Sequence, residues 1–256
     1  SPFSDARAAF PLWVEHSLIL DSLIGSETYD LGHVFSAECS GGVSGIAYLA
    51  GICSENKANA VSCVFDGNIA EFRRTLYHEV GHQLGANHTW SNCGEGTNDS
   101  QRNPTTAVEP GSGSTIMSYG GVCGSFNVVG NSHDNLHGVS ILEIQETLSR
   151  DSITCFETIS LENTNPSVII RPDSFSIPIL TPFELIAEGA DTEGDQISYC
   201  WEQYDTGPRS TYGSPIGNAP SFRSFQPNNS PVRVFPKLQT ILDQSFDKSE
   251  VMSTGG

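Results

Sequence analysis

Three histidines and one glutamate between residues 78 and 88 have the types and spacing of a metal-dependent catalytic site, in the string HEVGHQLGANH. On a helix, His78 and His82 would project from one face, one turn apart, close enough to share a metal ion. Glu79 is offset from both and could act on a water molecule held by that ion. Gly85 permits a left-handed turn that would end the helix and bring His88 round as a third ligand. Three neutral imidazoles and a water molecule form the open tetrahedral site of catalytic zinc.

This string matches the long zinc signature of the metzincin metalloproteases, and the chain resembles that family in a second place. The segment STIMSY at residues 114–119 is similar to the Met-turn, in which a methionine, here Met117, lies beneath the zinc ligands as an apolar floor. The order of segments 45–53, 61–66 and the zinc helix resembles the adamalysin or reprolysin branch, over about residues 1–157. The resemblance implies an α/β catalytic domain with a twisted mixed sheet, long helices and one catalytic zinc ion.

Residue 119 departs from the reprolysin pattern. That branch normally has proline two residues after the Met-turn methionine, where this chain has Tyr119. A tyrosine at this place looks like astacins and serralysins, in which its hydroxyl can bind zinc in the resting enzyme and hydrogen-bond the transition state. Tyr119 is therefore either a catalytic residue or a packed tyrosine of the turn. The whole layout also resembles secreted bacterial reprolysin-like proteases that carry β-sandwich modules.

The resemblance implies a zinc endopeptidase that acts on protein or peptide substrates. A zinc-activated water would attack the scissile carbonyl, with Glu79 as the general base. The substrate would lie extended and antiparallel to an edge strand. That strand contains Gly45, Ile46, Ala47 and Tyr48, and for Ile46 and Tyr48 ordinary sheet packing is an equal alternative. The rival function is a metal-binding adhesion module with a vestigial protease domain, against which the intact Glu79 argues.

Residues 1–158 have the hydrophobic patterns of the α/β domain that must position this site. Apolar residues recur at helical spacing in three segments, which we expect to be helices. These segments are 6–23, 71–85 and 139–148. Short apolar runs that are typical of strands occur at 32–35, 45–49 and 60–65. Residues 91–114 are rich in Asn, Gly, Ser, Thr and Pro, which predicts a long loop before the Met-turn.

The character of the chain changes after residue 158. The sequence NTNP at 163–166 indicates a linker, and the alternating runs beyond it are typical of an all-β sandwich of the immunoglobulin or PKD type. The clearest runs are 168–170, 183–186, 197–201 and 232–235. Such a sandwich needs about seven strands, and we count five or six. We therefore expect an accessory domain at 159–256 that is truncated at its C-terminal end.

The composition argues against two classes of partner. With 12 Lys+Arg against 30 Asp+Glu, the net charge of the 256 residues is −18, which is unsuited to nucleic acid or anionic membranes. No apolar run reaches the roughly 18–20 residues of a membrane helix. Six of the seven cysteines lie before residue 160, which predicts up to three disulfides and an oxidising compartment. We expect a secreted monomer whose signal and pro-segment have been removed.

Two weaker signals lie in the second half of the chain. Asp191, Glu193 and Asp195 surround a turn glycine and offer enough oxygen atoms for Ca²⁺. The alternative is an acidic, solvated hairpin. Cys200 is either a buried thiol or half of a disulfide whose partner lies beyond residue 256.

Overall fold

The computed structural model describes residues 2–64, 67–94, 99–244 and 250–252, which fold as two compact units that alternate along the chain. The first unit consists of residues 1–87 and 140–158, and the second of residues 88–139 and 159–256. The first unit ends at Thr158, where we placed the domain boundary. Residues 88–139, however, belong with the C-terminal residues, so the boundary after 158 stays a prediction.

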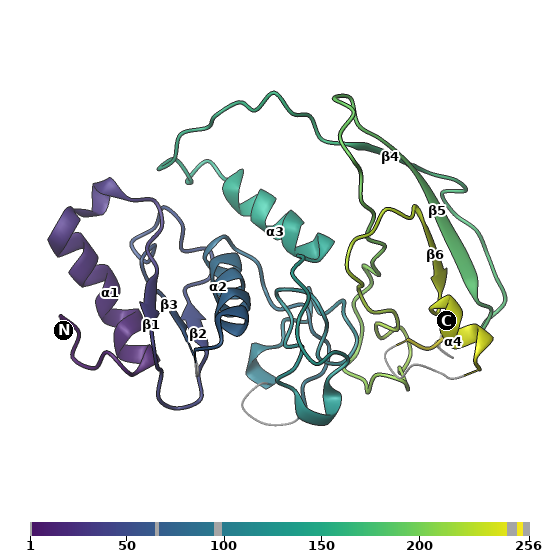
Figure 1. Cartoon of the computed structure of the whole chain (residues 1–256), viewed down its shortest axis with the longest axis horizontal. Coiled ribbons are helices and arrows are strands. Elements are labelled where there is room, and N and C mark those ends of the chain that lie inside the picture. Colours follow the sequence, from purple (N-terminus) through teal and green to yellow (C-terminus); the bar gives the residue numbers. More distant parts are fainter. Residues whose placement is uncertain (1, 65–66, 95–98, 245–249, 253–256) are drawn as a thin grey trace. The chain divides into compact units, whose positions relative to one another are not determined.

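The first unit is a small mixed α/β structure, as the sequence patterns predict. Its sheet has the order β1-β3-β2, with β3 parallel to β1 and antiparallel to β2, and it lies between α1 and α2 (Figure 1). The strands are β1 (Val34–Ser36), β2 (Gly45–Ala47) and β3 (Ala60–Cys63). The helices are α1 (Ala9–Ile24), α2 (Ile69–Gln83) and α3 (Gly138–Leu148), with a 3₁₀ turn at Ser26–Thr28. The described strand β2 therefore lies at an edge of the sheet.

The central strand β3 forms the core of the first unit. All its residues are buried, and Val61 packs with Ala9 and Leu12 of α1. A disulfide between Cys39 and Cys63 joins this core to the loop before β2. Burial on both faces of this short strand explains why its residues are apolar except for Ser62, which is hydrogen-bonded to His33.

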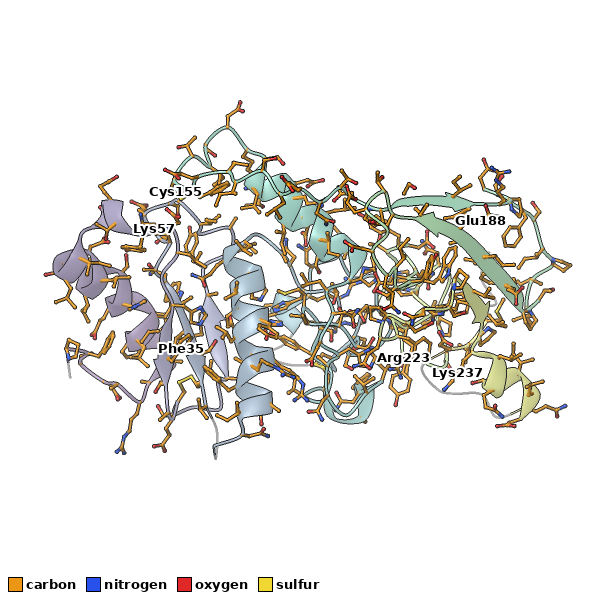
Figure 2. All side chains as sticks on the ribbon, turned by 45° about the horizontal axis from the view of Figure 1, so that its top comes forward. Phe35, Lys57, Cys155, Glu188, Arg223 and Lys237 are labelled. Atoms are coloured by element: carbon orange, nitrogen blue, oxygen red, sulfur yellow. A yellow bond between two sulfur atoms is a disulfide. The ribbon has the colours of Figure 1, made fainter. Side chains whose placement is uncertain are left out.

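Three disulfides confirm the predicted number. They are Cys39–Cys63, Cys53–Cys155 and Cys93–Cys123. Cys155, labelled in Figure 2, follows α3, and its disulfide with Cys53 joins this part of the chain to the loop after β2. Each disulfide lies inside one unit. Cys200 is a free thiol in the described structure.

Helix α2, which carries His78 and His82, has defined ends. The Asn68 side chain accepts a hydrogen bond from the amide of Glu71, which caps the first turn. Near the other end, Gln83 is fully buried, and its side chain donates to the carbonyl of Gly32 at 2.8 Å. His33 contacts the Gln83 oxygen and the Ser62 hydroxyl, each at 2.9 Å, so α2 is fastened to the sheet by polar side chains.

The second unit contains a long loop region and one small sheet. Residues 88–139 have only two 3₁₀ turns among their described residues before α3 begins, at Asp99–Gln101 and Gly124–Phe126. The antiparallel sheet has the order β4-β5-β6 and is followed by a short helix α4 (Leu238–Leu242). Its strands are β4 (Ser167–Ile170), β5 (Phe183–Ala190) and β6 (Val232–Phe235).

The sheet corresponds to three of the predicted strands. The prediction of a strand at 197–201 is wrong, because this segment makes only an isolated bridge between Tyr199 and Asn228. The described residues of this unit thus show one three-stranded sheet, and the immunoglobulin- or PKD-like sandwich stays a prediction. Within the described residues, no helix has the length and apolar character needed to cross a membrane.

Burial of His16 predicts a measurable acid sensitivity. Burial lowers the pKa of this imidazole, and a hydrogen bond to the Ala58 carbonyl at 2.7 Å partly opposes the shift. The unfolded chain therefore takes up the proton first. The stability conferred by the neutral ring is complete above about pH 6.5 and is lost as the pH falls through the folded-state pKa.

We expect His16→Gln, which keeps a side-chain N–H donor, to show a smaller fall in denaturation midpoint than the wild type between about pH 7.5 and about pH 5. Both proteins would be measured with excess chelator, so that metal release does not contribute. Identical pH profiles for the two proteins would contradict this role of His16.

Candidate metal centre

The three predicted histidines come together. His78 and His82 lie one turn apart on α2, with their Nε2 atoms 3.1 Å apart. His78, His82 and His88 each offer a ligand nitrogen, and these atoms lie within 4.8 Å of one another. Among the described residues this is the only group of three or more potential metal-ligating side chains at such distances.

Two of the rings are oriented by backbone carbonyls. Nδ1 of His82 lies 2.7 Å from the Ala86 oxygen, and Nδ1 of His88 lies 2.7 Å from the Gln101 oxygen. A carbonyl can only accept, so Nδ1 carries the proton in each ring and Nε2 is left as the ligand atom. Burial lowers the pKa of His88, which favours the neutral ring that a metal requires. Three neutral imidazole nitrogens fit a zinc ion with an open coordination position.

Gly85 makes this convergence possible. Its φ of +105° is a conformation that side-chain-bearing residues rarely adopt. A Cβ at this position would also lie 2.1 Å from Oγ1 of Thr147 on α3. The chain after the turn is held by Glu143, whose carboxylate accepts from the Asn87 backbone amide at 2.8 Å and from its side chain at 2.7 Å. A side chain of α3 thus holds Asn87, the residue before His88, in place.

Glu79 follows His78 on α2, and its side chain is buried. It is 6% exposed, and burial raises its pKa to about 8. A Cβ added to Gly45 would approach Oε1 of Glu79 to 2.6 Å, so the carboxyl group lies directly against the backbone of β2. Ile46 and Ala47 continue β2, and Tyr48 follows it. The structure thus brings the proposed base and the proposed substrate strand into contact at Gly45.

The segment 114–119, which we predict to be the Met-turn, lies in the second unit with His88. Met117 is fully buried, and its carbonyl accepts from the amide of Thr89, the residue after His88, at 3.1 Å. Tyr119 stacks on Trp90 and meets the His88 ring edge-on at 4.7 Å between centroids. Its hydroxyl donates to the Gln101 side chain. Tyr119 is therefore both packed in the turn and adjacent to a ligand.

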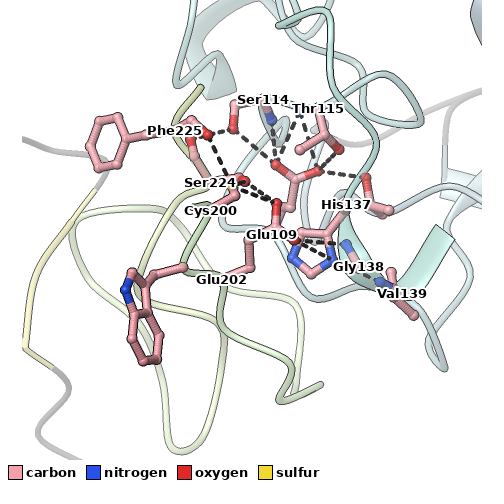
Figure 3. Close-up of polar contacts among 12 residues, drawn as sticks. Glu109, Ser114, Thr115, His137, Gly138, Val139, Cys200, Glu202, Ser224 and Phe225 are labelled. Atoms are coloured by element: carbon pink, nitrogen blue, oxygen red, sulfur yellow. Dashed lines mark hydrogen bonds and ion pairs between the residues drawn. The ribbon is translucent and has the colours of Figure 1, made fainter. Parts of the chain in front are cut away.

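Sequence reasoning missed Glu109, which joins the segment after His88 to the Met-turn. This carboxylate is 1% exposed and accepts hydrogen bonds from the Thr89 hydroxyl at 2.6 Å and the Thr115 hydroxyl at 2.5 Å. It also accepts from the Ser114 amide at 2.7 Å and the Ser114 hydroxyl at 3.0 Å (Figure 3). A buried carboxylate with this many donors ties both segments together. A single acidic residue in a loop gave no spacing signal by which it could be selected.

The proposed calcium ligands lie in a turn that is held by hydrogen bonds of their own. Oδ1 of Asp191 accepts from the backbone amides of Glu193 and Asp195, at 3.0 and 2.9 Å, and the Glu193 carboxylate accepts from Thr164. These bonds explain the turn without an ion, so calcium binding stays a prediction.

A comparison with protein families decides the assignment. The model of the reprolysin-like metallopeptidase family M12B matches residues 13–148, which is more than half of the chain and includes all three histidines. The chain belongs to the reprolysin-like metallopeptidases of family M12B. The match ends at the last residue of α3.

Curated relatives of this reprolysin-like metallopeptidase match over shorter segments. Disintegrin and metalloproteinase domain-containing protein 1 of Rattus norvegicus is 31% identical over 84 residues, which is 33% of this chain and 10% of the relative. The proteins 1a and 1b of Mus musculus are each 32% identical over 73 residues, or 28% of this chain and 9% of each relative. The matched part spans about a tenth of these relatives.

We expect Gly85→Ala to weaken zinc binding at least about tenfold, because the added methyl group would displace Thr147 or the turn before His88. Gly25→Ala is the matched control, since Gly25 ends α1 at φ +86° and a Cβ added there would have no atom within 4 Å. Both variants should lose about 1–2 kcal/mol from backbone strain. Equal zinc affinity for the two variants, measured by chelator competition, would contradict the role of Gly85.

Proposed function

We propose that this metallopeptidase is a secreted, zinc-dependent endopeptidase that hydrolyses peptide bonds with Glu79 as general base. The observation that carries the proposal is the convergence of three imidazole nitrogens, with a buried carboxylic acid at the residue that follows His78 on α2. Membership in the M12B family supports zinc-dependent proteolysis. Three disulfides are compatible with an extracellular protein.

The histidines and Glu79 have separate roles in this mechanism. His78, His82 and His88 would hold the zinc ion, which when bound supplies Lewis acidity toward water and the peptide carbonyl. Glu79 accepts a proton from the attacking water and delivers it to the leaving amine. Burial raises the pKa of this carboxyl group and the charge of a bound zinc ion would lower it, and a base with a pKa near the working pH can both take and return a proton. Such general acid–base catalysis contributes about 10²–10⁴-fold.

The edge strand β2 would bind the substrate backbone. An extended peptide paired antiparallel to residues 45–48 would pass Glu79, since the carboxyl lies against Gly45. Tyr119 would assist at the carbonyl oxygen, which is supported by its contact with His88. Its hydroxyl would then exchange the Gln101 partner for the substrate. Calcium at Asp191, Glu193 and Asp195, and a monomeric state, complete the proposal.

Digestion of casein or gelatin with and without a chelator tests the proposed activity. Cleavage that stops with chelator and returns with zinc supports an endopeptidase. Zinc binding without cleavage of either protein would instead favour the metal-binding adhesion module.

We expect Glu79→Gln to lower peptide cleavage by at least about 10²-fold while the protein keeps its zinc. The amide has nearly the same shape but cannot accept the proton of water. Rates on a fluorogenic peptide and bound metal would be measured on the same preparation. A variant that retains more than a tenth of the wild-type rate would exclude Glu79 as the base.

Gly45→Ala should reduce kcat, because a methyl group would push the Glu79 carboxyl from its place against β2. A displacement near 1 Å of a catalytic group can cost about 10²-fold. Zinc affinity should stay unchanged, since the three atoms nearest to an added Cβ all belong to Glu79. Wild-type kcat in this variant would show that Glu79 does not act from the position seen here.

A further inference from the structure

The segment 202–224, which we call the brace segment, makes hydrogen bonds to the loops that follow His88. It lies well beyond residue 148, where the family match ends. Residues 88–139 and the brace segment belong to the same compact unit. The contacts are therefore part of one packed body, and they reach the loops on both sides of the Met-turn (Figure 3).

Glu202 makes the central contacts of the brace segment. Its Oε2 accepts from the backbone amide of Gly138 at 2.7 Å and lies 3.7 Å from Nδ1 of the buried His137. Its Oε1 accepts from the hydroxyl of Ser224. The Glu202 side chain is only 12% exposed. One carboxylate thus holds both the chain that enters α3 and the end of the brace segment.

Ser224 connects Glu202 to the Met-turn through a second hydrogen bond. Its carbonyl accepts from the Ser114 hydroxyl at 2.9 Å. Ser114 is the first residue of the segment 114–119, and its amide donates to Glu109. Its single hydroxyl proton is shared between two acceptors, the Ser224 carbonyl and the Glu109 carboxylate. A chain of buried polar contacts therefore runs from Glu202 through Ser224 and Ser114 to Glu109.

The brace segment also holds the neighbouring loops through backbone carbonyls and long side chains. Arg223, labelled in Figure 2, donates to the Val128 carbonyl at 3.4 Å and lies 3.3 Å from Nε2 of His133. The Tyr212 hydroxyl donates to the Ser125 carbonyl at 3.0 Å. The carbonyls of Gly207 and Ser210 accept from Arg102 at 2.9 Å and from Asn92 at 3.1 Å.

We propose that the brace segment is a positioning element for the metal site and that Glu202 is the residue through which it holds the Met-turn. Residues 88–139 contain little regular structure among their described residues, so side-chain hydrogen bonds must offset the entropy of ordering their backbone. Removing one acceptor of a buried network leaves its donors unpaired, which loosens the attached segment. This proposal rests on the metal site of the proposed function but does not require that the site cleaves peptides.

Glu202→Gln in the full chain tests this role, with Glu250→Gln as the matched control. Glu250 is a fully buried acid of the second unit whose hydrogen bonds in the described structure go to Arg233 and the Lys237 amide. It reaches the brace segment only through Arg233, which donates to the Arg223 carbonyl at 2.7 Å. Amide hydrogen exchange of residues 112–135, zinc release into a chelator, and the absorption bands of the cobalt-substituted protein would be measured. None of these readouts needs enzymatic activity, so they remain informative if no substrate is cleaved.

We expect Glu202→Gln to raise exchange in 112–135 and the zinc release rate by at least about tenfold, and to shift the cobalt bands. Glu250→Gln should change all three less, because Glu250 contacts the brace segment only through Arg233. Equal behaviour of the two variants in these readouts would overturn the proposal. If Glu202→Gln does not fold, Arg223→Gln replaces it. Faster exchange at 124–135 than in Glu250→Gln would then support the brace, and equal exchange would overturn it.

Discussion

The site depends on one backbone constraint, which is that helix α2 must end soon after its second histidine. Two histidines one turn apart can share a metal, but a third at the next turn of the same helix would lie too far along the axis. Gly85 allows the chain to leave the helix at a positive φ, and Thr147 leaves no room for a side chain there. The approach of His88 to His78 and His82 follows from this turn.

Buried and partly buried carboxylates hold the chain once it has left the helix. Glu143 fixes Asn87, Glu109 joins Thr89 to the Met-turn, and Glu202 holds the entry to α3. Each accepts N–H or O–H groups, and most of these donors are in irregular backbone, where no helix or sheet partner exists. An acidic chain can bury such groups because each is matched by donors. Part of the negative charge therefore has a structural use.

The sequence predicted the local parts of this site better than the long-range ones. The spacing on α2, the turn at Gly85 and the short strands around Val61 depend on neighbouring residues, and the structure shows them. Glu109 and Glu202 could not be selected, because their partners are set by tertiary folding. The run at 197–201 has the alternation of a strand, but only Tyr199 finds a bridge partner. The interleaving of 88–139 with the C-terminal residues has no local signal.

X-ray absorption at the zinc edge of the purified 256-residue chain measures the proposed ligand set itself. We expect one zinc ion per chain with three imidazole nitrogens at about 2.0–2.1 Å and one further light atom from solvent. Replacing any one of the three histidines should remove one imidazole from the shell. A shell that contains sulfur, or one that keeps three imidazoles after His88→Ala, would contradict the site described here.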